Sequence, residues 1–221
     1  MSKIKLLIFD LDGTLVDSKL DLANAVNYAL KSLDLPPVRN KIIYDFIGDG
    51  VWQLVERSFG PKNSDKVEEG FKLFRDYYKE HLLDTTVLYP GVEDTLKCFK
   101  KLRKCVVTNK SEVFSKTIIN GLNIGHYFDL VYGGDTFDKR KPDPFALLKA
   151  IEELKVSPSE TIMIGDSRND VQVAKAANTV SCAVGYGLED RETLLSNKPD
   201  FFIESITELR NILKGNILKG Y

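Results

Sequence analysis

The second half of this chain alternates short apolar runs with segments of helical periodicity. An apolar run of the same kind opens the chain within residues 3–11. The later runs lie at residues 104–108, 130–133, 161–165, 179–184 and 201–203. Strands that alternate with helices pair in parallel and are covered by helices. We therefore expect an α/β fold built on one parallel sheet, with the N-terminal run as one of its strands.

Residues 16–85 contain helical patterns only, so a different kind of structure is expected there. Apolar side chains recur at helical spacing after Ser18 and again after Pro61. These positions are Leu22, Val26, Ala29 and Leu33 in the first pattern and Val67, Phe71, Phe74, Tyr78 and Leu82 in the second. We expect an all-helical domain at 16–85, inserted into a core made of residues 1–15 and 86–221.

The charge balance of the chain argues against large charged partners. Its 31 basic and 32 acidic residues give a net charge of -1, with no long block of one sign. A nucleic-acid-binding surface or a membrane-attracting patch is therefore not expected. The apolar run 4–9 is too short for a signal-peptide core, and no run approaches the length of a membrane span. We expect a cytoplasmic protein with small-molecule partners, either a monomer or a homodimer.

The cysteines do not suggest a disulfide framework or a zinc site. Cys98, Cys105 and Cys182 are odd in number and show no C-x-x-C spacing, and the chain has only two histidines. We expect three buried, reduced thiols.

Four short polar segments follow the apolar runs or open the next helix. They are Asp10–Thr14 (DLDGT), Thr108–Asn109, Lys141–Pro142 and Gly165–Asp170 (GDSRND). A doubly wound sheet binds its ligands beyond the carboxyl ends of its strands. Each segment alone also occurs in ordinary turns, so the prediction depends on their combination and order. Together they predict one phosphate-handling site.

A carboxylate that attacks a phosphate monoester must overcome the repulsion between two anions. At about 3.5 Å and an effective dielectric of about 20, this repulsion is roughly 4 to 5 kcal/mol per unit charge. Asp10, as the nucleophile, and Asp166 can hold a Mg²⁺ ion through carboxylate oxygens, and Lys141 adds a second positive charge. Asp170 lies one helical turn after Asp166. It either ligates the metal directly or, as we favour, orients a metal-bound water.

Asp12 is the candidate general acid and base. Gly13 permits a sharp turn, so the Asp12 side chain can face the leaving oxygen while its backbone carbonyl still reaches the metal. In a two-step reaction through a phosphorylated Asp10, Asp12 first donates a proton and then removes one from water. The Thr108 hydroxyl and nearby backbone N–H groups can bind the phosphoryl oxygens. Asn109 is expected to bind there too and to fix that loop.

Gly48 and Gly50 precede a helix start inside the helical block. Such a start offers N–H groups and a positive dipole end to an anion, but a purely structural turn explains these glycines equally well. They are therefore candidate substrate contacts. Asp49 lies between them, and its charge disfavours an anionic substrate unless it points away or pairs with Lys110 or Arg168.

The combined segments resemble the motifs of the haloacid dehalogenase superfamily, and the resemblance covers nearly the whole chain. Asp10–Thr14 is similar to the first motif, Thr108 to the second, Lys141 to the third, and Gly165–Asp166 with Asp170 to the fourth. This resemblance implies a Rossmann-like parallel sheet core with an inserted all-helical cap domain. In the family, that cap is mobile and closes over a small substrate to exclude water.

The presence of Asp12 distinguishes the phosphatases of this superfamily from its dehalogenases, which lack such a carboxylate. Segments 46–51, 108–110 and 165–171 are similar to those of phosphoglycolate phosphatases. The resemblance implies Mg²⁺-dependent hydrolysis of a small phosphate monoester, 2-phosphoglycolate, to glycolate and phosphate. Pyrophosphatases and other small-metabolite phosphatases of the superfamily share much of the signature and remain alternatives.

A function of another class is a receiver-type phosphoacceptor module for signalling. Receivers also combine an aspartate, Mg²⁺, Thr and Lys. Their size, close to the common domain size of about 100 to 150 residues, leaves no room for a helical insertion. They also lack a role for Asp12. We therefore favour an enzyme over a signalling module.

Overall fold

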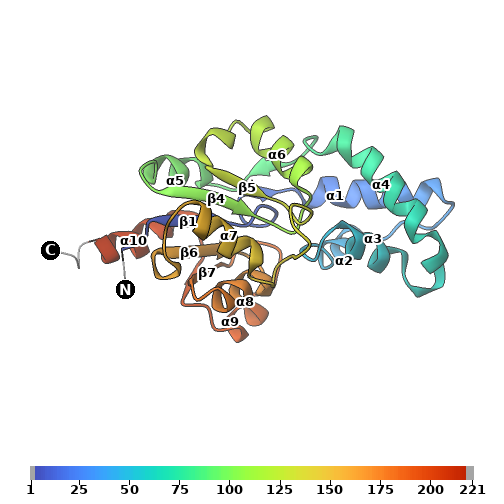
Figure 1. Cartoon of the computed structure of the whole chain (residues 1–221). Coiled ribbons are helices and arrows are strands. Elements are labelled where there is room, and N and C mark those ends of the chain that lie inside the picture. Colours follow the sequence, from blue (N-terminus) through green and yellow to red (C-terminus); the bar gives the residue numbers. More distant parts are fainter. Residues whose placement is uncertain (1–2, 218–221) are drawn as a thin grey trace.

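The computed structural model describes residues 3–217 and has a six-stranded parallel sheet at its centre (Figure 1). The strands run in the order β5-β4-β1-β6-β7-β8. Their bounds are β1 (Leu6–Phe9), β4 (Arg103–Val107), β5 (Leu130–Tyr132), β6 (Thr161–Gly165), β7 (Val180–Val184) and β8 (Phe201–Ile203). Each coincides with an expected apolar run to within a few residues, so the predicted α/β fold is confirmed. Residues 1–2 and 218–221 of the predicted core lie outside the described residues.

Helices cover both faces of the sheet because successive side chains of a strand point to opposite faces. These helices are α5 (Val92–Cys98), α6 (Glu112–Gly121), α7 (Phe145–Glu153), α8 (Arg168–Ala176), α9 (Arg191–Ser196) and α10 (Leu209–Ile217). Leu7 and Phe9 of β1 belong to a buried cluster that includes residues of α5, α6 and α10. Leu6 and Ile8 belong to a second cluster with residues of α7 and α8. The central strand is therefore buried on both sides.

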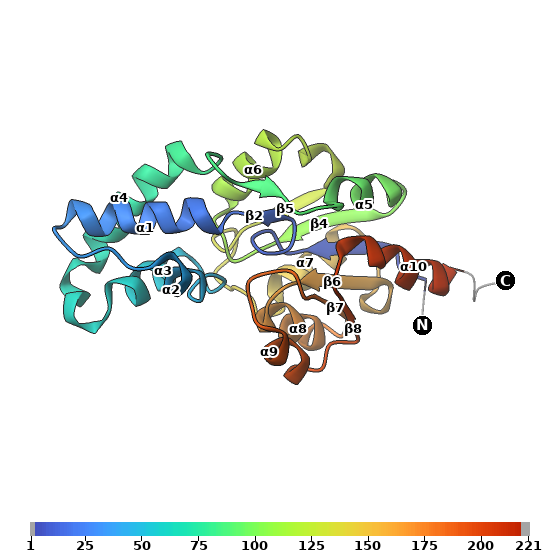
Figure 2. The ribbon, with the colours of Figure 1, turned by 180° about the vertical axis from the view of Figure 1, so that it is seen from behind.

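The helical block lies beside the sheet, at the opposite end of the molecule from α10 (Figure 2). It consists of α1 (Lys19–Ser32), α2 (Asn40–Tyr44), α3 (Val51–Phe59), the short 3-10 helix η1 (Pro61–Lys66) and α4 (Val67–His81). Helices α1 and α4 lie side by side, and the apolar stripe of each is buried in one cluster. The sequence did not predict α2, because its five residues are too few to show a helical period.

The boundary between the block and the sheet differs from the all-helical expectation. Val16–Asp17 form a short strand, β2, which pairs antiparallel with β3 (Val87–Leu88). Beside this pair, the buried carboxylate of Asp21 on α1 accepts hydrogen bonds from the backbone N–H and hydroxyl groups of Thr85 and Thr86. The two segments that connect the helical block to the sheet are thus joined to each other by hydrogen bonds. A two-residue strand pairing with a distant segment leaves no periodic signal in the sequence.

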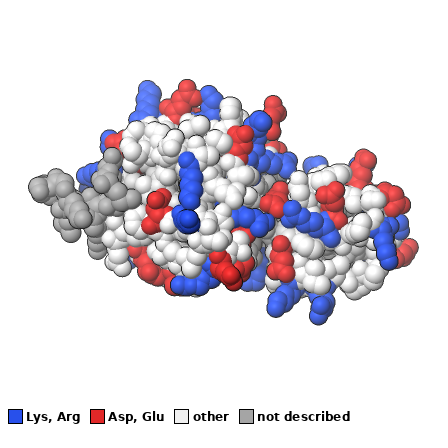
Figure 3. All heavy atoms as spheres, turned by 90° about the horizontal axis from the view of Figure 1, so that it is seen from below, with Lys and Arg blue, Asp and Glu red and all other residues white. Residues whose placement is uncertain are grey.

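The surface charges and the exposure of the cysteines bear on the predictions made from the composition. On the face shown in Figure 3, Lys and Arg are interspersed with Asp and Glu, so that face has no broad basic patch. No helix within residues 3–217 is both long enough and apolar enough to span a membrane. All three cysteines are free, but Cys98 is exposed on α5, which corrects the expectation that all three are buried.

Candidate active site

Three of the four predicted segments meet at the carboxyl edge of the sheet. β1 pairs with β4 on one side and with β6 on the other. Asp10, Thr108 and Asp166 each follow directly after one of these strands. Lys141, from the loop between β5 and α7, reaches the same place and lies 3.0 Å from Asp10. The parallel topology therefore brings together residues that are up to 156 positions apart in the chain.

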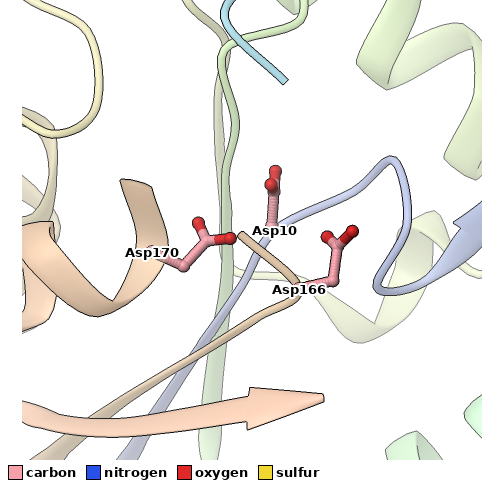
Figure 4. Close-up of side chains that lie close together, drawn as sticks. All are labelled: Asp10, Asp166 and Asp170. Atoms are coloured by element: carbon pink, nitrogen blue, oxygen red, sulfur yellow. The ribbon is translucent and has the colours of Figure 1, made fainter. Parts of the chain in front are cut away.

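Asp10, Asp166 and Asp170 form a buried carboxylate cluster in which one oxygen of each side chain lies within 4.8 Å of the others. Figure 4 shows the three side chains converging from the end of β1, the loop after β6 and the start of α8. Burial raises the pKa of Asp10 to about 6; the charge of Lys141 opposes this rise in part, and the charge of Asp170 adds to it. Burial, with the charges of Asp10 and Asp170, also raises the pKa of Asp166 well above its usual value. Full ionisation of the three carboxylates is therefore unfavourable without further positive charge.

Lys141 supplies only part of the positive charge that this cluster needs. Its ammonium lies 3.0 Å from Asp10 and 2.6 Å from Asp170. Burial alone would lower the pKa of Lys141, but the two carboxylates outweigh that effect and raise it. Three carboxylates and one ammonium leave a formal charge of -2. A hard divalent cation such as Mg²⁺, which prefers carboxylate oxygens, fits this donor set and balances its charge.

Neighbouring side-chain and backbone groups hold Asp166 in place on several sides. Its carboxylate accepts hydrogen bonds from the Thr14 hydroxyl (2.9 Å) and the Leu188 N–H (2.8 Å). A Cβ atom on Gly13 would lie 2.0 Å from Oδ2 of Asp166, and a Cβ on Gly187 would lie 2.2 Å from its Cβ. Glycine is therefore needed at both positions for the backbone to approach Asp166 this closely. The loop after β7 that contributes Gly187 and Leu188 was not predicted as part of the site.

Asp170 has partners for both of its oxygens. Oδ1 accepts a hydrogen bond from Lys141, and Oδ2 accepts from the backbone N–H and hydroxyl of Ser167 at 3.0 and 2.7 Å. The latter contacts form a capping box at the start of α8. These bonds orient Asp170 toward Lys141 and the cluster, an arrangement that suits an orienting role.

Asp12 lies apart from the carboxylate cluster and faces a different cation. Its side chain accepts hydrogen bonds from the Ser18 hydroxyl and from the Lys110 ammonium, the latter at 3.1 and 3.2 Å. Lys110 in turn donates to the Tyr78 hydroxyl on α4 at 2.8 Å. The sequence did not predict this network, because Tyr78 occupies an ordinary core position of the helical stripe. The two carboxylates of the DLD sequence thus have separate surroundings.

Gly48 and Gly50 bring the helical block against the core. Both have positive φ angles, of 123° and 100°, and Gly50 immediately precedes α3. The Asn109 amide donates to the backbone carbonyls of Gly48 (3.0 Å) and Lys141 (3.1 Å). Both N–H groups of the side-chain amide therefore hold neighbouring loops. The backbone N–H of Asn109 is the donor that this residue can still offer to a phosphate.

Asp49 pairs with neither of the cations that the sequence suggested. It lies 2.7 Å from Arg57 on α3 and accepts a hydrogen bond from Asn169 at 2.9 Å. Lys110 pairs with Asp12 instead, and Arg168 lies 3.3 Å from Glu189. Partial burial raises the pKa of Asp49, but the bonds from Asn169 and Arg57 outweigh burial and hold it below its usual value. Its charge is thus compensated outside the carboxylate cluster.

A narrow chamber of about 30 Å³ lies above Asp10, between the core and the helical block. Its core side consists of Asp10, Asp12, Thr108, Asn109 and Lys110, and its other side consists of Leu22, Ile47, Gly48, Gly50, Val51 and Leu54. A wider cavity of about 320 Å³ also borders Asp10 and Asp12, and Asp166, Arg57 and Arg168 line it. The chamber has room for about one water molecule. Only a small group fits beside Asp12 while the block holds this position.

Comparison with known proteins decides the family. The model of the haloacid dehalogenase-like hydrolases matches residues 7–184, which include all four predicted motifs. The chain belongs to the haloacid dehalogenase-like hydrolases. The resemblance noted from the sequence is thereby confirmed, and the chain is an enzyme of a hydrolase family.

Several relatives within this hydrolase family match nearly the whole chain. A phosphoglycolate phosphatase of Chromobacterium violaceum is 40% identical, covering 97% of this chain and 98% of its own. One of Neisseria meningitidis is 37% identical, covering 93% and 92%. A crystal structure described as "a predicted phosphoglycolate phosphatase" from Haemophilus somnus 129pt superposes with a TM-score of 0.89 at 30% identity, over 96% and 99% of the two chains. The fold of this hydrolase, including the helical block, is shared with that structure.

Proposed function

We propose that this chain is a Mg²⁺-dependent phosphatase that hydrolyses 2-phosphoglycolate through a phosphorylated Asp10. The observation that carries the proposal is the position of Asp10 and Asp12 on the floor of one narrow chamber closed by the helical block. Asp10 lies beside Lys141 and the other two carboxylates of the cluster, and Asp12 faces the space left for a leaving group. We propose residues 16–85 as the cap that closes over the substrate.

Asp10 is the nucleophile in this proposal. The Leu11 N–H donates to Oδ1 at 2.7 Å and Lys141 lies 3.0 Å from Oδ2, so the carboxylate has a fixed orientation. One carboxylate oxygen attacks phosphorus, and the bond from phosphorus to the ester oxygen breaks as Asp12 gives that oxygen a proton. Glycolate leaves, and the phosphoryl group remains on Asp10.

The second half-reaction uses the same two carboxylates. Asp12, now deprotonated, takes a proton from a water molecule that attacks phosphorus, and the bond to Asp10 breaks to release phosphate. The Thr108 hydroxyl and the neighbouring backbone N–H groups bind the equatorial oxygens. Lys141 remains beside Asp10 throughout and offsets the charge of the phosphoryl group.

Asp10, Asp166 and the backbone carbonyl of Asp12 would hold the Mg²⁺ ion, with Asp170 orienting one of its water ligands. When bound, the ion supplies positive charge that lowers the repulsion between the carboxylate and the phosphoryl oxygens. Asp166 is already held by Thr14 and Leu188, so little reorganisation is needed.

The choice of 2-phosphoglycolate rests on size and on the names of the relatives. A chamber of about 30 Å³ excludes a nucleoside or a sugar, and a two-carbon leaving group needs the smallest displacement of the helical block. The similar proteins of Chromobacterium violaceum and Neisseria meningitidis are both named phosphoglycolate phosphatases. We also propose a cytoplasmic location, in keeping with three cysteines that form no disulfide.

A steady-state assay with Mg²⁺ tests this proposal, using 2-phosphoglycolate, pyrophosphate, a sugar phosphate and a nucleotide. We expect many turnovers per protein and the highest kcat/KM with 2-phosphoglycolate. A higher kcat/KM for pyrophosphate or the nucleotide would overturn the assignment of 2-phosphoglycolate as the substrate but would leave the phosphatase mechanism unaffected. Phosphorylation limited to one equivalent would overturn the enzyme itself and favour a signalling role.

A further inference from the structure

The narrow chamber contains a buried cation to which the reaction above gives no role, Lys110. Its side chain is only 2% exposed. Among the described residues that line the chamber, it is the one Lys or Arg. Lys141 serves the other side of Asp10, where it contacts Asp170. The leaving-group side of the site therefore has a cation of its own.

Both parts of the molecule hold Lys110. Its ammonium lies 3.1 and 3.2 Å from the two carboxylate oxygens of Asp12, next to the sheet. The Tyr78 hydroxyl, from α4, lies 2.8 Å away, and the ammonium is 4.7 Å from the centre of the Tyr78 ring. Tyr78 is itself fully buried and packs against Phe74 and Phe114. Lys110 is thus positioned as firmly as Lys141.

Among the described residues, the helical block contributes no charged side chain to the chamber wall. The helical block contributes the apolar side chains of Leu22, Ile47, Val51 and Leu54. A carboxylate buried against such side chains without a partner is strongly destabilised. Arg57 and Arg168 line the wider outer cavity instead and are paired with Asp49 and Glu189.

We propose that Lys110 determines specificity by pairing with the carboxylate of the substrate's leaving group, and that Tyr78 positions it. In 2-phosphoglycolate, one methylene separates the ester oxygen from the carboxyl carbon. An ester oxygen that receives its proton from Asp12 therefore brings the carboxylate to the ammonium that lies beside Asp12. The inference rests on the proposed function, and it extends to short monoesters whose carboxylate is attached directly to the ester carbon.

The test compares 2-phosphoglycolate with ethyl phosphate, which has the same ester linkage and a methyl group in place of the carboxylate. The measured quantity is the ratio of the two kcat/KM values, because a general effect on Asp12 cancels in that ratio. We expect Lys110→Met to lower the ratio by about 100-fold, as for the loss of one partner of a buried charge pair. Arg57→Gln, which removes a cation from the outer cavity, is the matched control and should leave the ratio within about 3-fold.

Two further variants decide the matter if Lys110→Met does not fold. Lys110→Arg keeps the charge and should retain at least part of the preference for 2-phosphoglycolate. Tyr78→Phe removes one hydrogen bond from the ammonium and should lower the ratio by about 5-fold, chiefly through KM for 2-phosphoglycolate. Equal losses on both substrates in the Lys110 variants, or a fall of the ratio in Arg57→Gln instead, would overturn the inference. A wild-type protein that does not prefer 2-phosphoglycolate would overturn the proposed function itself.

Discussion

The proposed phosphate end and the proposed leaving-group end of this site are built in different ways. At the phosphate end, buried carboxylates and Lys141 lie on loops anchored by paired strands of the sheet. At the other end, apolar side chains such as Ile47 and Val51 close the chamber from the helical block. Charged groups on a rigid sheet edge can hold reacting atoms in one geometry. Apolar side chains on a separate block can only select by size and shape.

Beside the apolar packing of Tyr78 on Phe114, several hydrogen bonds join the two parts. They include the bonds from Asn109 to Gly48, from Asn169 to Asp49 and from Lys110 to Tyr78. Contacts of this kind can break and form again without disturbing the core of the sheet. We infer that the core determines the chemistry, whereas the block and its contacts with the core determine which leaving group is accepted.

The largest effect is expected from Asp10→Asn, at the phosphate end. The variant removes the nucleophile and a metal-ligand charge but keeps the shape, and turnover should fall by at least about 10⁴-fold. Lys141 still has Asp170 at 2.6 Å, so its charge is not left unpaired and the fold should persist. Phosphate release is the measurement and circular dichroism the control. Appreciable turnover by a folded Asp10→Asn protein would refute the covalent route.

Removal of the metal should also abolish turnover. Mg²⁺ should restore it, whereas Ca²⁺ should bind but support little activity, because it often takes a carboxylate in bidentate fashion and would occupy the attacking oxygen. Phosphate release in a chelator, then with each ion, is the measurement. Full activity in the chelator would contradict the metal assignment.

The same ion should change stability in a pH-dependent way. Burial raises the pKa of Asp10 to about 6 from 3.8, so the folded metal-free protein binds this proton more tightly than the unfolded chain. The contribution of Asp10 to stability is therefore lost as pH rises from about 4 to about 6. Mg²⁺ favours the ionised cluster, so the rise in Tm on adding Mg²⁺ should be larger at about pH 7.5 than at about pH 5. The rise should be much smaller in Asp10→Asn at both pH values.

Asp12→Asn tests the boundary between the two ends and should have an intermediate effect. Loss of the general acid and base should lower kcat for 2-phosphoglycolate by about 10² to 10⁴-fold. An activated aryl phosphate needs no proton on its leaving group, so only its second step should be slow and phosphorylated Asp10 should accumulate. A burst of the phenol in rapid-mixing experiments would detect this. Unchanged turnover of 2-phosphoglycolate would remove Asp12 from its proposed role.

The sequence predicted the phosphate end much better than the leaving-group end, and the reason is physical. Asp10, Thr108 and Asp166 follow apolar strand runs, so the rules of parallel sheets alone place them at one edge. The contacts of the helical block join residues far apart in the chain, such as Lys110 with Tyr78, and neither residue shows its partner through any local pattern. The same limit explains the missed β2–β3 pair and the pairing of Asp49 with Arg57. Local periodicity predicts elements, whereas contacts between separate units depend on tertiary structure.

The smallest effect is expected at the leaving-group end, from Gly50→Ala with Gly60→Ala as its control. The two glycines flank α3 and have similar backbone angles, with φ of 100° and ψ of 164° for Gly50 and φ of 72° and ψ of 169° for Gly60. This region is almost restricted to glycine, so each variant should lose about 1 to 3 kcal/mol of stability. A Cβ on Gly50 would lie 3.1 Å from the Arg140 guanidinium at the contact with the core, whereas a Cβ on Gly60 would meet no atom within 4 Å.

Gly50→Ala should therefore also lower kcat/KM for 2-phosphoglycolate by about 10-fold, since the shifted loop closes the chamber less well, and Gly60→Ala should not. An aryl phosphate, whose apolar end does not depend on that closure, should show a smaller loss. Equal kinetic losses in the two variants would mean that strain in α3, and not the fit of the loop on the core, governs activity. The inference that the block selects the leaving group while the core performs the chemistry would then be wrong.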